Sequence, residues 1–245
     1  EILWQAKPHI GTDRLRETVK TIRKEIEGLG GQVLFSHRLS DIAVKDGALR
    51  AVSVQTPDGM REMPCTALIL AIGHSADDTM DMLFRRGVPM EQKPFSMGVR
   101  IEHRRQDIDR SQYGAFAGHP ALGAADYKLS CRPAGGRGVY TFCMCPGGEV
   151  IAAASAPGRL VVNGMSAHAR DAENSNSALL VGVGSADYAS DHPLAGFAFQ
   201  KKWEAAAFAV GGGQYRAPAQ TVGDFLKGRA STGAGAVQPS YRQGV

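Results

Sequence analysis

Cysteines are the residues of this 245-residue chain best suited to redox or metal chemistry, and two of the four lie close together. Cys143 and Cys145 belong to an alternating stretch, residues 139–145, which is typical of a strand and would place both side chains on one face. Their spacing differs from that of a helix-borne dithiol, and no His or Cys partners lie nearby in the sequence. We therefore expect buried thiols that pack as small apolar groups, with a redox pair as the alternative and no metal site.

Short hydrogen-bonding side chains are dense directly before an apolar stretch, residues 178–183, which is typical of a strand. Such side chains favour turns, and they also line binding sites. Asn163 lies at the start of this polar stretch. Arg170, Asn174 and Asn176 lie further along it and are suited to orienting a carboxylate or an amide. The sequence leaves open whether the stretch is a solvated turn or part of a substrate site.

A short apolar stretch without charge, residues 67–72, ends at Gly73. This pattern predicts a buried strand that stops at a sharp turn. In open α/β sheets, ligands bind at the carboxyl ends of strands, and a glycine there lets the backbone approach a ligand closely. The turn is either part of a cofactor site or an ordinary turn after a core strand.

The elements that would position this turn follow one another in a fixed order. Thr12 or Asp13 is expected to cap a helix that ends at Gly30, because either side-chain oxygen can accept a hydrogen bond from an N–H group of the first turn. A strand is predicted at residues 32–37, and a three-stranded meander with two Asp-Gly turns at residues 42–63. The helix carries one apolar stripe, formed by Leu15, Val19, Ile22, Ile26 and Leu29.

The second half of the chain has a different pattern of predicted helices and strands. After a short helix at residues 78–86, we expect a strand at residues 95–101, a hairpin at residues 139–155 and a helix at residues 193–210. The sequence thus predicts an α/β fold that becomes α+β in its second half. The domain boundary is placed between 1–87 and 88–245.

Composition excludes several classes of function. The 28 Lys and Arg residues and 24 Asp and Glu residues give a net charge of +4 without a basic run, so nucleic-acid binding is not expected. No apolar stretch reaches the roughly 18 residues of a membrane span, and the few cysteines form no disulfide framework. We expect a cytoplasmic protein. The sequence shows no recognisable motif that would combine Ser, His and Asp for nucleophilic catalysis.

Five short motifs carry a family resemblance. They lie at residues 9–13 (His-Ile-Gly-Thr-Asp), 71–74 (Ala-Ile-Gly-His), 94–98 (Pro-Phe-Ser-Met-Gly), 143–149 (Cys-Met-Cys-Pro-Gly-Gly-Glu) and 163–166 (Asn-Gly-Met-Ser). With these motifs the chain resembles bacterial FAD-dependent dehydrogenase-like proteins built on the glutathione-reductase type of FAD fold. The resemblance implies a central fragment: part of a layered β/β/α FAD-binding domain with its β-meander, and an inserted substrate domain of mixed sheet and helix.

The resemblance also implies a cofactor and its contacts. FAD would be held mainly by backbone groups of Val33, Ala71, Ile72 and Gly73, with NAD(P)H as a candidate electron donor. On the substrate side, a turn formed by Pro146, Gly147 and Gly148 would face the flavin, near the polar stretch described above. The substrate would be a small molecule, and no catalytic residue is assigned.

The chain lacks two parts of the family pattern, namely the Gly-x-Gly-x-x-Gly turn that binds the FAD pyrophosphate and the C-terminal segment that closes over the flavin. We therefore expect the isolated chain to bind FAD weakly or not at all and to be inactive. Its partners would be the flanking segments of the same polypeptide. Two alternatives remain: a non-catalytic interaction or substrate-binding module derived from a flavoprotein, and a purely structural domain.

Overall fold

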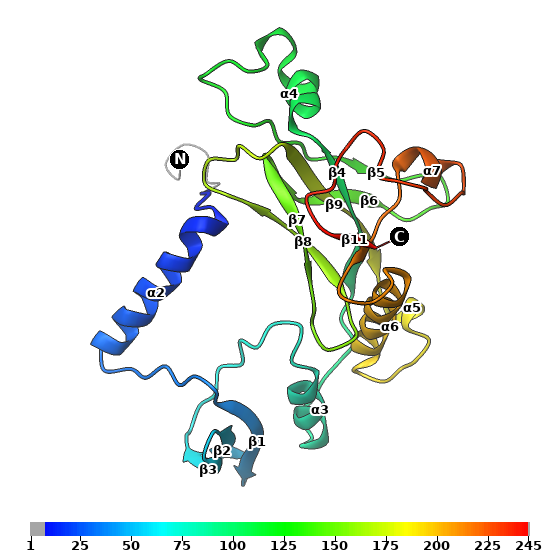
Figure 1. Cartoon of the computed structure of the whole chain (residues 1–245). Coiled ribbons are helices and arrows are strands. Elements are labelled where there is room, and N and C mark those ends of the chain that lie inside the picture. Colours follow the sequence, from blue (N-terminus) through cyan, green and yellow to red (C-terminus); the bar gives the residue numbers. More distant parts are fainter. Residues whose placement is uncertain (1–7, 245) are drawn as a thin grey trace. The chain divides into compact units, whose positions relative to one another are not determined.

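The chain folds into helices and mostly antiparallel strands that form two compact units. The computed structural model describes residues 8–244 (Figure 1). Unit 1 contains the chain up to Lys20, the stretch Pro94–Gly184 and the chain from Gln200 onward; unit 2 contains Thr21–Lys93 and Ser185–Phe199. The domain boundary between residues 87 and 88 concerns the intact protein and stays a prediction.

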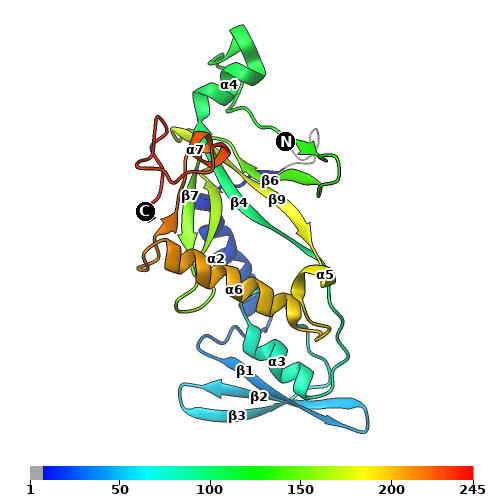
Figure 2. The same cartoon turned by 90° about the vertical axis from the view of Figure 1, so that its right-hand side faces the viewer.

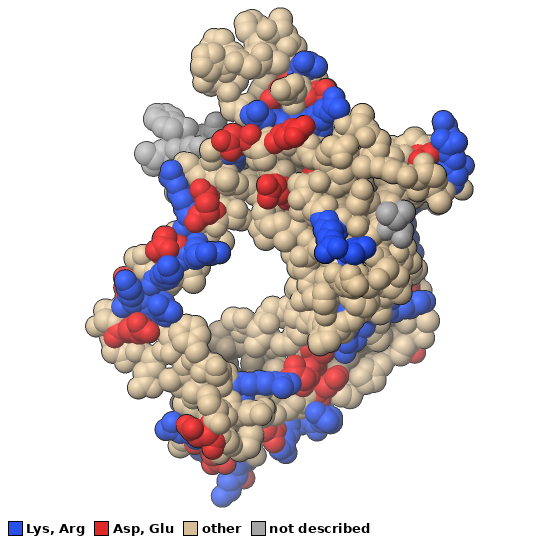
Figure 3. Space-filling model, in the orientation of Figure 1, with Lys and Arg blue, Asp and Glu red and all other residues tan. Residues whose placement is uncertain are grey.

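The predicted first helix is confirmed as α2 (Thr12–Gly28). The carbonyl of Gly11 accepts the first helical bond, and Gly30 ends the helix with a φ of +86°. Charged side chains of both signs follow the helix (Figure 3). Its apolar stripe is exposed: the five side chains of the stripe are between 43% and 83% accessible, so no described residue buries them.

Unit 2 is built on the predicted meander, which is confirmed. Strands β1 (Arg38–Lys45), β2 (Ala48–Thr56) and β3 (Gly59–Pro64) pair antiparallel in that order. Helix α3 (Asp77–Arg85) packs against them over a small core of Ile42, Val52, Val54, Met82 and Leu83. Two ion pairs, Arg38 with Asp78 and Arg86 with Asp41, join helix to sheet and lower the pKa of both carboxyls.

Two predicted strands of this half are wrong for the described chain. Residues 32–37 and 67–72 are irregular, and neither pairs with another strand (Figure 1). Most of their apolar side chains are exposed, with Phe35 at 65% and Ile69 at 91%, and only Val33 and Ile72 are half-buried. A strand needs a neighbour to share its backbone hydrogen bonds, and no described segment provides one here. The layered β/β/α arrangement therefore remains a prediction.

Unit 1 is centred on a four-stranded antiparallel sheet with the order β4-β9-β6-β5. Its strands are β4 (Phe95–Arg104), β9 (Asn174–Val183), β6 (Val139–Cys145) and β5 (Ser130–Cys131). The predicted strand at residues 95–101 is confirmed as part of β4, which pairs with β9 along its whole length (Figure 2).

The predicted hairpin at residues 139–155 is wrong. Strand β6 pairs with β9 and β5, whereas β7 (Gly148–Ala153) pairs with β8 (Val161–Ser166) in a separate two-stranded sheet. An irregularity in β6 after Phe142 and a left-handed residue at Gly147 lead the chain out of the first sheet before β7 begins.

Helices and short strands complete the chain. They are α4 (Arg105–Tyr113), the 3₁₀ turn η1 (Gly114–Phe116), α5 (Ser185–Tyr188), α6 (Ala195–Val210), β10 (Ala217–Pro218), α7 (Val222–Leu226) and β11 (Gln243–Gly244). The predicted helix at residues 193–210 is confirmed as α6, and β10 and β11 pair in parallel. None of the helices within residues 8–244 is long and apolar enough to span a bilayer.

Candidate functional site

The residues predicted to contact FAD lie in two irregular segments of unit 2. Val33 and Ile72 are half-buried, whereas Ala71 and Gly73 are exposed. Gly73 has a φ of +67°, which favours glycine, and a Cβ built on it would meet no heavy atom within 4 Å. The backbone of this turn is therefore open to a ligand, as close contact with a dinucleotide would require.

The Pro146–Gly148 turn in unit 1 packs against two backbone segments. The N–H of Gly147 donates to Ser175 Oγ at 3.0 Å, and its carbonyl accepts from the N–H of Ala172 at 3.2 Å. Gly147 is left-handed (φ +47°), and a Cβ on it would lie 1.7 Å from the carbonyl oxygen of Arg170. The structure thus brings this turn together with the backbone at Arg170 and the start of β9.

The polar stretch before the predicted strand is itself part of a strand. Strand β9 begins at Asn174, four residues earlier than the sequence predicts. Asn174, Ser175, Asn176 and Ser177 are all buried, the last three completely. A solvated turn is therefore excluded for these four residues, and their polar groups must find partners inside the protein.

Arg100 on β4 supplies one of these partners. Its Nη1 donates to Asn176 Oδ1 at 2.5 Å and to the carbonyl of Cys143 at 3.2 Å. A Cβ on Gly164 of β8 would collide with the guanidinium and with the Asn176 amide, so glycine is needed for β8 to lie there. The Nδ2 of Asn176 is buried and has no hydrogen-bond partner among the described residues.

Glu102, two residues further along β4, holds the other side of the cluster. Asn174 Nδ2 donates to its carboxylate at 3.0 Å, and Ser240 Oγ donates to it at 2.6 Å. The same Ser240 Oγ accepts from the N–H of Val150 at 2.7 Å, which ties the C-terminal segment to β7. Arg100 and Glu102 were not predicted as site residues. The sequence marks them only as two charged residues, two positions apart, in the stretch that forms β4.

Asn163 and the Arg170 side chain are not drawn into this cluster. Asn163 is exposed on β8 opposite Ile151. Arg170 is half-buried with a φ of +53°, and its Nε has no hydrogen-bond partner among residues 8–244. Of the substrate-side candidates, the structure therefore gathers the Pro-Gly-Gly turn, Asn174 and Asn176, while Arg170 takes part through its backbone.

The motif at residues 9–13 docks onto the connection between β8 and β9. His9 Nε2 bonds to the carbonyl of Ala167, and His168 Nδ1 to the carbonyl of Ile10, each at 3.0 Å. The Asp13 carboxylate accepts the N–H of His168 at 2.9 Å, which lowers the pKa of that carboxyl. The motif thus fixes the loop that leads to Arg170.

A half-buried pair of titratable groups lies on the sheet. His103 Nε2 and Tyr127 Oη are 2.7 Å apart. Burial lowers the pKa of His103, and the nearby carboxylates of Glu102 and Asp107 oppose this only in part. Burial also raises the pKa of Tyr127. Burial therefore favours the neutral form of both groups.

Lowering the pH from about 7 to about 5 is expected to reduce the free energy of unfolding through His103. The unfolded chain, with an ordinary histidine pKa of 6.5, takes up a proton before the folded chain does. The stability due to the neutral imidazole is fully present above that value and is lost as the pH falls through the lower pKa of the folded state. Urea unfolding at both pH values measures this loss. His103→Gln should make the pH dependence smaller, and an unchanged dependence would contradict the assignment.

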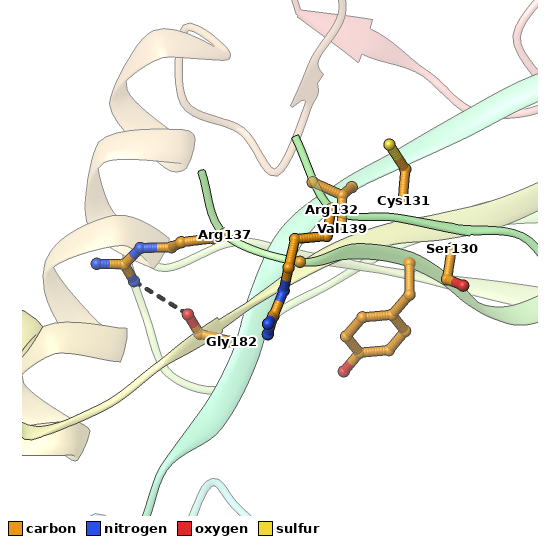
Figure 4. A pocket seen from close by; sticks show the side chains of 8 residues that line it. Ser130, Cys131, Arg132, Arg137, Val139 and Gly182 are labelled. Atoms are coloured by element: carbon orange, nitrogen blue, oxygen red, sulfur yellow. Dashed lines mark hydrogen bonds between the residues drawn. The ribbon is translucent and has the colours of Figure 1, made fainter. Parts of the chain in front are cut away.

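An open pocket of about 620 Å³ lies at the other end of β6 (Figure 4). It is lined by Ser130, Cys131, Arg132, Arg137, Gly138, Val139, Tyr140 and Gly182. Arg137 Nη1 donates to the carbonyl of Gly182 at 3.0 Å, and no acidic residue lines the pocket. None of the predicted site residues is among them. Within residues 8–244 no three His, Cys, Asp or Glu side chains are arranged to hold a metal ion.

The fold and the site define an α+β module. A polar cluster that includes Arg100, Glu102 and the buried Asn176 lies between its four-stranded sheet and the β7–β8 pair. Residues 94–245 match the family model described as "FAD-dependent protein, C-terminal domain-like", and the chain belongs to this family. It is a flavoprotein-related module.

A curated relative from Clostridium beijerinckii, named "Uncharacterized protein", is 52% identical over all 245 residues of this chain. The chain spans 45% of the length of that relative.

Proposed function

We propose that this chain is the central portion of an FAD-dependent oxidoreductase that transfers a hydride between the flavin and a small-molecule substrate. The observation that carries the proposal is the open, left-handed turn at Gly73, which follows an apolar segment that no described strand covers. Membership of an FAD-dependent family supports FAD as the cofactor. A cytoplasmic location stays a prediction.

In this proposal the chain's own residues line the FAD site and orient the substrate. The backbone groups of Val33, Ala71, Ile72 and Gly73 line the dinucleotide, and the exposed apolar side chains of residues 67–72 pack against polypeptide outside this chain. FAD supplies the electron-transfer chemistry when it is bound. The Pro146–Gly148 turn is buried and its Gly147 backbone is bonded to Ser175 and Ala172, so in this proposal it supports the substrate side from within. NAD(P)H is the candidate electron donor.

Replacing Gly73 with Asn in the intact protein is expected to weaken FAD binding by about tenfold or more, because a side chain would stand between the backbone and the dinucleotide. Asn tolerates a left-handed φ, so the fold should suffer little. Gly47→Asn is the matched control, since Gly47 also has a positive φ (+72°) and open space around it. Flavin absorbance and fluorescence titrations measure both affinities. Equal FAD affinity of the two variants would contradict the role of Gly73.

A second experiment separates the enzyme from a non-catalytic module. The exposed apolar stripe of α2 favours the module, because such a face also suits a protein partner. An intact protein that is yellow and whose flavin is reduced by NAD(P)H or a substrate supports the oxidoreductase. A colourless intact protein that forms a stable complex with a partner supports the module.

A further inference from the structure

Strand β6 is irregular at its two cysteines. The pairing of β6 with β9 shifts register between Phe142 and Cys145, and Cys143 has a φ of +47°, which is unusual for a residue other than glycine. Arg100 Nη1 holds the bulge by donating to the Cys143 carbonyl at 3.2 Å. The expectation that both cysteines are buried on one face of a regular strand is therefore wrong.

The bulge gives the two thiols different environments at close range. Cys143 is exposed, whereas Cys145 is only 8% accessible. Cys145 Sγ lies 3.4 Å from the carbonyl oxygen of Cys143. Burial raises the pKa of the Cys145 thiol, the neighbouring Cys143 thiol raises it further, and the charge of Arg100 opposes both. An accessible thiol thus lies beside a protected one in the bulge that Arg100 holds.

We propose that Cys143 and Cys145 form a redox-active dithiol that reacts with small-molecule disulfides of the glutathione type. The Cys143 thiolate attacks one sulfur of the disulfide, whose S–S bond breaks, and one thiol leaves with a proton. The Cys145 thiolate then attacks the Cys143 sulfur and releases the second thiol, also with a proton. The protein dithiol is oxidised to a disulfide, and the small disulfide is reduced to two thiols.

Peptide mass mapping after treatment with oxidised glutathione tests this proposal on the 245-residue chain without flavin. Residues 143–145 are expected to lose two hydrogens and to carry no lasting glutathione. Cys131 is the internal control, because it is exposed like Cys143 but lies on β5 opposite Val139 rather than beside a second cysteine. If Cys131 reacts with oxidised glutathione, it should keep the glutathione adduct.

Single variants distinguish the two thiols. Cys145→Ala should trap glutathione on Cys143 at about tenfold or higher occupancy than in the wild-type chain, since the second attack is removed. Cys131→Ser should leave the 143–145 disulfide unchanged.

Two results would overturn the proposal: wild-type Cys143 holding as much glutathione as it does in Cys145→Ala, or Cys143 staying reduced under conditions in which Cys131 reacts. Both readouts are independent of FAD, so they can fail while the proposed oxidoreductase function stands.

Discussion

Replacing Gly147 with Ala is expected to destabilise the chain by about 3 kcal/mol or more. Two effects add at this residue. A left-handed φ of +47° is unfavourable for alanine, and the new Cβ would lie 1.7 Å from the carbonyl oxygen of Arg170, a backbone atom that cannot rotate away. Urea unfolding followed by far-UV circular dichroism measures the loss.

Gly158→Ala is the control for the backbone effect alone. Gly158 belongs to the same unit and has a positive φ (+74°), but a Cβ added to it would meet no heavy atom within 4 Å. Its replacement should cost about 1 kcal/mol. If the two variants lose the same stability, the contact between the Pro-Gly-Gly turn and Arg170 is not as close as described.

Arg100→Met is expected to lower the free energy of unfolding by about 2 to 3 kcal/mol. The change removes the charged donor from Asn176 Oδ1 and from the Cys143 carbonyl, and Asn176 is completely buried. The Asn176 amide would then lack partners for both its oxygen and its nitrogen. Urea unfolding again provides the measurement, with Arg132→Met, an exposed arginine, as a control that should change stability by less than about 0.5 kcal/mol.

A double variant tests whether the loss of stability in Arg100→Met comes from the Asn176 amide that is left without hydrogen-bond partners. Adding Asn176→Leu to Arg100→Met removes both partners and leaves an apolar contact, which is less costly than an unpaired buried polar group. The two changes should therefore be non-additive by about 1 kcal/mol or more. Strict additivity would mean that Arg100 and Asn176 do not stabilise each other.

Local signals predicted the elements that depend on local interactions. Helix α2 follows from its apolar spacing and its terminal glycines, and the β1–β3 meander follows from two Asp-Gly turns whose backbone bends the chain by itself. These features need no distant partner, so they can be inferred from a few neighbouring residues.

Elements that depend on a distant partner could not be predicted in the same way. Residues 67–72 have the composition of a core strand, but a strand forms only where another one pairs with it. The strand order β4-β9-β6-β5 joins segments far apart in the sequence, and the hairpin expected at residues 139–155 failed because a bulge redirects the chain.

In the candidate site, too, features set by neighbouring residues could be predicted and features set by distant residues could not. The polar residues of β9 resemble a turn in the sequence, and their partners lie far away along the chain. Arg100 and Glu102, more than seventy residues away, bond to Asn176 and Asn174, and the Gly147 N–H bonds to Ser175. The Gly73 turn was predicted from its own residues, whereas the neighbours of Gly147 were visible only in three dimensions.

The bond between Ser240 and Glu102 has a consequence for synthesis on the ribosome. The two residues are 138 positions apart, and β11 lies further still along the chain, against β10. Strands β4, β6 and β9 can pair before residue 240 has left the exit tunnel, but the carboxylate of Glu102 must wait for its hydroxyl partner. Nascent chains stalled before and after this point should therefore differ in protease resistance.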